Sequence, residues 1–330
     1  MLTDLFAVAS AIDVAAVEVA IPPSCRRGVV PAPPVTRDGA DAVVELGPWR
    51  PRHPARHLVP SLSPLERACR FRFEASVRAP GGWSPWVATT TVGGPDFPPP
   101  LGRGPGLEAH VDYWRAPVPV GEVRLRVRCD DAAALRGPWL ATLSASDLAP
   151  GVPPPGSGMP AVRLDVPAVS QMAEGGEIGA RICSPASVAM VLAYWGRRVD
   201  VRPLARDMLH AALDLYGVWP AAIRAAARRG VLGYLMRFPD WPAAAWCLAR
   251  AIPIIASVRY APGELPGAAI PATPGHLLVL TGYEDDHVYV NDPAANTRGA
   301  VKRRYRLTDL ARVWLDRSGV GYVLFDPTST

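Results

Sequence analysis

CSPASVAMVLAYWG, residues 183–196, is the stretch that decides the fold of the second half of the chain. Good helix formers dominate it, and apolar residues recur at positions 188, 191, 192 and 195, the spacing of one helix face. Gly196 follows as a stop signal. We therefore predict a helix that begins at Cys183.

Downstream of this helix, the sequence changes from helical to strand-like patterns. Further helices are predicted at 203–213, 220–229 and 241–250, and a proline opens each of the first two. Strand-like segments follow at 252–260, 276–283, 287–292, 303–307 and 321–325, with a helix around 308–315. Helices first and an antiparallel sheet afterwards predict an α+β fold.

The first half of the chain has the pattern of a β protein. FRFEASV (71–77) and VRLRVRC (123–129) alternate in polarity, as half-buried strands do. GGWSPWVATTTV (81–92) and VDYWRAP (111–117) are rich in aromatic and β-branched residues. Prolines and glycines separate these segments, which favours an antiparallel sandwich. Residues 20–60 have no clear period, and we predict no element there.

A proline-rich stretch, APGVPPPGSGMP at 149–160, is the clearest boundary in the sequence. A chain of 330 residues is long for a single hydrophobic core. We therefore predict a mostly β accessory domain at 1–148, a linker at 149–162 and an α+β domain at 163–330.

Composition argues against several classes of protein. The apolar runs are far shorter than the roughly 20 residues that cross a bilayer, so no membrane span is expected. The net charge of +5 is modest, and the basic runs Arg224–Arg229 and Lys302–Arg306 are short and separate, unlike a nucleic-acid interface. The five cysteines have neither metal-ligand spacing nor the even count of a disulfide framework. No metal or organic cofactor is implied.

The N-terminal segment MLTDLFAVASAIDVAAVEVA does not resemble a secretory signal. It lacks a basic start, and Asp4, Asp13 and Glu18 interrupt its apolar residues. A cytoplasmic location is the default expectation. Export would be expected only if the start codon were misassigned and a signal sequence preceded this segment.

A helix that begins at Cys183 would suit a reactive thiol. The N-terminus of a helix carries roughly half a positive charge, which lowers a thiol pKa. It also leaves backbone N–H groups free to face a substrate oxygen. Taken alone, Cys183 is better explained as a buried core cysteine.

His276 and Asp292 belong to a predicted hairpin. His276 opens one strand, Asp292 ends the next, and an acidic turn at 284–286 joins them. The start of the first strand and the end of the second lie at the same end of a hairpin. Asn291 is an alternative partner, but neighbouring strand positions face opposite sides, so only one of the two can face His276.

VPAVSQ (166–171), CSPASVAMVLAYWG and PGHLLVLTGYEDDHVYVNDPA, in this order, resemble the peptidase family thirty-nine-like domain of the papain-like clan, related to bacteriocin leader peptidases. The resemblance runs through about 163–325 and implies a papain-like fold. It implies that Cys183 is the nucleophile, His276 the base and Asp292, rather than Asn291, the orienting residue. It also implies that Gln171 and the Cys183 N–H form the oxyanion hole.

The N-terminal part resembles, more weakly, the sandwich-like region that precedes this domain in some bacterial proteins. LVPSLSP (58–64) and GGWSPWVATTTVGG (81–94) carry that likeness. The expected function is thiol hydrolysis of peptide or amide bonds through an acyl-enzyme, with a peptide or protein as substrate. An acyltransferase and a non-catalytic binding module are the alternatives. The transporter segments of leader peptidases are missing here, so their specificity is not carried over. Nothing indicates the oligomeric state.

Overall fold

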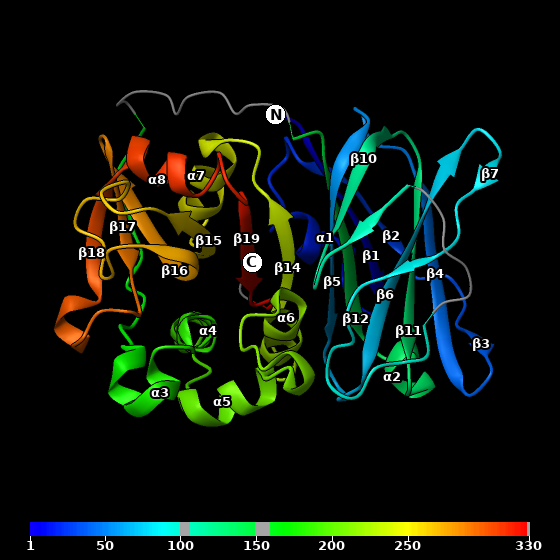
Figure 1. Cartoon of the computed structure of the whole chain (residues 1–330), viewed down its shortest axis with the longest axis horizontal. Helices are drawn as coiled ribbons and strands as arrows, with labels where there is room; N and C mark the ends of the chain where they lie inside the picture. The colour runs from blue at the N-terminus through cyan, green and yellow to red at the C-terminus, as the bar shows by residue number, and fades with distance from the viewer. Residues whose placement is uncertain (100–105, 149–158, 329–330) are drawn as a thin grey trace.

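The computed structural model of the chain describes residues 1–99, 106–148 and 159–328. Residues 149–158 of the predicted linker lie outside these ranges. Figure 1 shows the β-rich N-terminal half on one side and a mixed region of helices and strands on the other. The predicted fold class, an α+β region preceded by a mostly β region, is confirmed.

Two sheets form the N-terminal half and face each other across one hydrophobic core. The first has the order β2-β1-β12-β5-β10-β9, with bounds Arg26–Pro31, Thr3–Ser10, Trp139–Ser146, Ala55–Pro64, Trp114–Val120 and Glu108–Ala109. The second has the order β3-β4-β11-β6-β7 with β8 paired to β6, and its bounds are Thr36–Asp38, Asp41–Trp49, Val123–Cys129, Phe71–Ala79, Gly82–Trp83 and Val87–Ala88. Two short helices, α1 (Val14–Glu18) and α2 (Ala132–Arg136), connect strands.

The expectation of no regular structure at 20–60 is wrong, because β2, β3, β4 and most of β5 lie there. The prolines of β5 made this segment look unlike a strand in the sequence. Pro60 and Pro64 pair with β12 but lie beyond Ala55–Leu58, the part of β5 that pairs with β10. A proline that lacks a second ladder partner costs the sheet little.

A third, wholly antiparallel sheet forms the C-terminal half, with the order β14-β19-β15-β16-β17-β18 and β13 paired to β16. The strands span Leu232–Arg237, Val320–Phe325, Ile254–Tyr260, Thr273–Glu284, His287–Asn291, Lys302–Arg306 and Val162–Arg163. The helices are α3 (Gly176–Gly179), α4 (Cys183–Tyr194), α5 (Val201–Met208), α6 (Trp219–Ala227), α7 (Trp241–Ala249) and α8 (Leu307–Val313), with 3-10 turns η1 (Gln171–Glu174), η2 (Ala211–Leu213) and η3 (Arg298–Ala300).

Helices cover both faces of this sheet (Figure 1). Helices α4, α5 and α6 share a core with Ile255 of β15, whereas α7 and α8 share another with its neighbours Ile254 and Ala256. A strand buried on both faces has no polar side, which explains why the segment around Ile254 is continuously apolar.

The two halves meet along β14, the edge strand of the third sheet, which packs on β5 and β12. Serine hydroxyls bond its free backbone edge: Ser63 Oγ donates to the Gly233 carbonyl at 2.8 Å, and Ser144 Oγ accepts from the Arg237 N–H at 3.0 Å. Leu5 of β1 shares a buried core with the third sheet. The domain boundary near 149–162 stays a prediction, and the contact between the halves is extensive.

Candidate active site

Cys183 is the first residue of α4, as the sequence predicted, and its side chain is half-buried. The helix is held against β16, where Ser187 Oγ donates to the Leu277 carbonyl at 3.2 Å. Since Ser187 lies one turn after Cys183, this contact brings the start of the helix to the start of the strand. The ring of His276 lies beside the thiol of Cys183 and lowers the pKa of that thiol.

The hairpin of β16 and β17 brings His276 and Asp292 together. Asn291 pairs with Val279, so His276 and Asp292 are out of direct register. Asp292 follows β17, and its Oδ1 lies 2.8 Å from His276 Nε2. Both side chains are buried. Because Nε2 faces Asp292, Nδ1 is the ring nitrogen left for the thiol of Cys183.

Asp292 rather than Asn291 faces the imidazole. The amide of Asn291 turns the other way and donates to the Val166 carbonyl at 3.0 Å. Tyr305, on β18, donates its hydroxyl to Asp292 Oδ2 at 2.9 Å, and the Ala294 N–H donates to Oδ1 at 3.1 Å. Tyr305 was not predicted as a site residue from the sequence. Its one distinguishing signal was an aromatic residue in a strand otherwise rich in arginine.

Hydrogen bonds overcome burial in setting the charge of this site. Burial raises the pKa of the Cys183 thiol, but the hydrogen bond to His276, the charge of the ring, and backbone hydrogen bonds from Leu277 and Ser184 hold that pKa below its ordinary value. Burial likewise opposes a charged ring, yet Asp292 and Cys183 raise the pKa of His276 to about 10. The arrangement therefore favours a thiolate beside an imidazolium.

Gln171 is buried and begins η1, and it is not among the residues that line the cleft. Its amide nitrogen donates to the Gly179 carbonyl at 2.7 Å, which uses one of the two amide hydrogens. Its Oε1 is buried and has no hydrogen-bond partner among the described residues. The oxyanion role of Gln171 stays a prediction that depends on the second amide hydrogen.

Cys183 and His276 open onto a cleft of about 730 Å³. Residues of the N-terminal half form one wall of it, among them His57, Tyr113 and Arg115. None of these three residues was predicted from the sequence to belong to the site. They lie on or beside β5 and β10 of the first sheet, so only the packing of the two halves brings them to the thiol.

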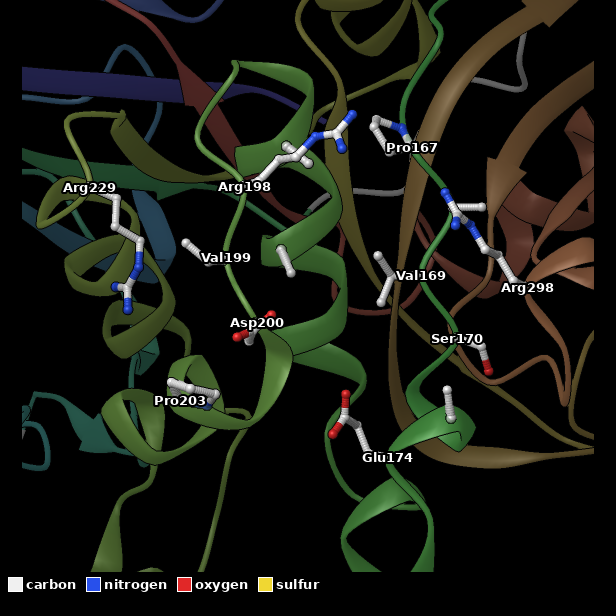
Figure 2. Close-up of a pocket in the computed structure, with 14 residues that line it drawn as sticks. Pro167, Val169, Ser170, Glu174, Arg198, Val199, Asp200, Pro203, Arg229 and Arg298 are labelled. Atoms are coloured by element: carbon white, nitrogen blue, oxygen red, sulfur yellow. The ribbon is translucent and has the colours of Figure 1, made fainter.

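A second hollow, of about 710 Å³, lies farther along α4 (Figure 2). Ala189 and Ala193 line it, six and ten residues beyond Cys183, which is roughly 9 and 15 Å along a helix. Figure 2 shows Arg198 on one side of the hollow and Arg298 on the other. None of the described residues that line it is a cysteine or histidine, whereas Cys183 and His276 both line the first cleft.

Within residues 1–99, 106–148 and 159–328, no group of three or more histidine, cysteine or acidic side chains is arranged to hold a metal ion. None of the helices in these ranges is both long and apolar enough to cross a bilayer. All five cysteines are free.

The family model of the Peptidase_C39 like family matches residues 163–322. This region is a peptidase C39-like domain. No curated protein sequence matches the chain.

Solved structures similar to this C39-like domain include a double glycine motif protease from an AMS/PCAT transporter, in complex with its leader peptide (19% identity, TM-score 0.35, covering 51% of this chain and 99% of that one). A putative C39-like peptidase from Bacillus anthracis is another (17% identity, TM-score 0.39, covering 50% of this chain and 98% of that one). The peptidase domain of Streptococcus ComA, a bifunctional ABC transporter involved in quorum sensing, is a third (17% identity, TM-score 0.36, covering 48% of this chain and 98% of that one).

Proposed function

We propose that the protein hydrolyses peptide bonds with Cys183 as nucleophile, His276 as acid and base, and Asp292 as the residue that orients the ring. The observation that carries this proposal is the continuous contact from the thiol at the start of α4 through His276 to Asp292, at the wall of an open cleft. A nucleophile, a base and an orienting group in contact are what thiol catalysis requires.

In the proposed reaction, the Cys183 thiolate attacks the carbonyl carbon of the scissile bond. The His276 imidazolium gives its proton to the departing amine, and a thioester to Cys183 remains. His276 then takes a proton from water, whose oxygen displaces the sulfur and releases a carboxylic acid. The developing oxyanion would accept hydrogen bonds from the Cys183 N–H and from the second amide hydrogen of Gln171.

Two alanine variants test this proposal. Cys183→Ala should abolish cleavage of peptides that the wild-type protein cuts, as measured by mass spectrometry of the products of a peptide library. Cys247→Ala is the matched control, because Cys247 lies buried in α7 and burial raises the pKa of its thiol well above the ordinary value. Cleavage that persists in Cys183→Ala would disprove the assignment.

A further inference from the structure

The cleft beside Cys183 is lined far more by basic than by acidic side chains. Its charged lining residues are Asp214 and five arginines, namely Arg115, Arg181, Arg237, Arg259 and Arg317. A cleft with one sign of charge concentrates ligands of the other sign. The question is which of these positive charges remain available to a ligand.

Three of the arginines already have partners in the protein. Arg181 forms an ion pair with Asp214 at 2.7 Å, and Arg317 pairs with Glu264 at 2.9 Å. Arg237 is buried and donates to the carbonyls of Arg317 and Ser318. These contacts hold the three guanidinium groups in place and compensate part of their charge.

Arg115 and Arg259 differ from the other three. Both are exposed, and neither side chain has a hydrogen bond or ion pair to any residue in the described parts of the chain. They come from opposite halves: Arg115 lies on β10, whereas Arg259 lies on β15, directly after the residue that pairs with His276. Both guanidinium groups lie near the phenol of Tyr113. Burial raises the pKa of this phenol, and the positive charges of the two arginines oppose that rise.

His57 adds an unsatisfied polar group to the same wall. It pairs with Arg115 across β5 and β10, so the two side chains lie on one face of the sheet. The ring is 8% exposed, and its Nδ1 has no hydrogen-bond partner among the described residues. Burial and the neighbouring charge of Arg237 lower the pKa of His57 to about 3, so the ring is neutral and can donate a hydrogen bond.

We propose that the cleft selects substrates that carry a carboxylate near the scissile bond, and that Arg115 and Arg259 bind this carboxylate from opposite walls. His57 Nδ1 is a third group able to meet it. The inference rests on the proposed function, because it names the substrate class of the same site. Guanidinium groups bind carboxylates through paired N–H donors, which gives such selection both direction and strength.

Alkylation of Cys183 tests this without knowledge of the natural substrate. Iodoacetate carries a carboxylate and iodoacetamide does not, so the ratio of their rates at Cys183 measures attraction to negative charge. Arg115→Gln combined with Arg259→Gln should lower this ratio at least about threefold. Arg136→Gln, an exposed arginine of α2, is the matched control and should leave it unchanged. The charge of His276 is present in the wild-type protein and in both variants, so it does not affect the comparison of their ratios.

The salt dependence of the wild-type ratio is a second measurement that needs no variant. The ratio should fall as salt rises, because attraction between exposed charges is screened. If the double variant keeps the wild-type ratio, or if the wild-type ratio is independent of salt, the carboxylate inference is wrong while the thiol assignment stands. If neither reagent modifies Cys183 faster than Cys247, the proposed function fails and the inference with it.

Matched peptides identify the source of the carboxylate. A cleaved peptide is compared in two pairs: glutamate against glutamine beside the cut, and a free against an amidated C-terminus. A higher kcat/KM for glutamate points to an acidic side chain, and a higher value for the free acid points to a terminal carboxylate. Equal values within both pairs would overturn the inference.

Discussion

Asp292 uses both oxygens of its carboxylate at the centre of the site. Oδ1 meets His276 and the Ala294 N–H, and Oδ2 accepts the hydroxyl of Tyr305. Burial raises the pKa of Asp292, but these hydrogen bonds hold that pKa below its ordinary value. The charge retained on Asp292 in turn keeps His276 protonated.

Asp292→Asn should narrow the pH range over which the protein cleaves peptides. In the wild-type protein, the thiolate appears below the ordinary pKa of a thiol, and the imidazolium is lost as pH rises through about 10. Without the carboxylate, the pKa of His276 falls, so the upper limit moves down. Because the positive ring stabilises the thiolate, the lower limit moves up. The pH profile of iodoacetamide labelling measures the lower limit, because only the thiolate reacts. The pH profile of kcat/KM for peptide cleavage measures the upper limit, because cleavage needs the imidazolium as acid, and kcat/KM itself should drop at least about tenfold.

Asp285→Asn is the control for this change in charge. Asp285 is exposed at the tip of the same hairpin, with φ of 52°, a conformation that asparagine tolerates. Its profile should match that of the wild-type protein. An unchanged profile in Asp292→Asn would contradict the orienting role of the carboxylate.

At the scale of elements, local patterns in the sequence were sufficient for α4 and for the β16–β17 hairpin. The helical period ending at Gly196 and the tight acidic turn are both properties of contiguous residues. Strand alternation showed that only one of Asn291 and Asp292 can face His276. The contact between Cys183 and His276, in contrast, was implied only by the family resemblance. That contact depends on how α4 packs on the sheet.

Strand β14 and the N-terminal wall of the cleft could not be predicted in this way. The partner of β14 within its sheet is β19, far along the chain, and its other edge is bonded by serines of β5 and β12. His57 likewise faces the thiol only because β5 turns its odd-numbered residues toward the C-terminal half. Non-local contacts of this kind leave no period in the sequence.

The serines that bond the edge of β14 should contribute to stability in proportion to their hydrogen bonds. Ser144→Ala leaves the buried Arg237 N–H without its partner, and we expect a loss of about 1–3 kcal/mol in the free energy of unfolding. Ser146, on the same strand, is also buried, but its hydroxyl has no partner in the described ranges. Ser146→Ala should therefore change stability by less than about 0.5 kcal/mol. Urea unfolding measures the free energy of unfolding of both variants. Equal losses in Ser144→Ala and Ser146→Ala would refute the edge-bonding role of Ser144.

At the scale of the whole molecule, the central strands of the first sheet, β1, β12 and β5, are buried on both faces. In β1, Phe6 and Val8 point into the core between the two N-terminal sheets, whereas Leu5 and Ala7 point into the core shared with the C39-like domain. Tyr234 of β14 completes the connection, because its hydroxyl donates to the Ala20 carbonyl at 2.7 Å. The N-terminal half thus supplies part of the core of the C39-like domain as well as a wall of its cleft.

Removal of residues 1–148 should therefore leave the C39-like domain unable to fold by itself. The truncated chain would expose β14 as an unpaired edge together with the apolar surface that Leu5 covers, and such edges promote aggregation. We expect no cooperative urea transition and no selective labelling of Cys183, whereas the full chain should show both. Adding residues 1–148 as a separate fragment should restore labelling if the shared core is the cause. A truncated chain that unfolds cooperatively and labels at the wild-type rate would instead mean that the halves are independent domains, with the N-terminal one contributing only to substrate binding.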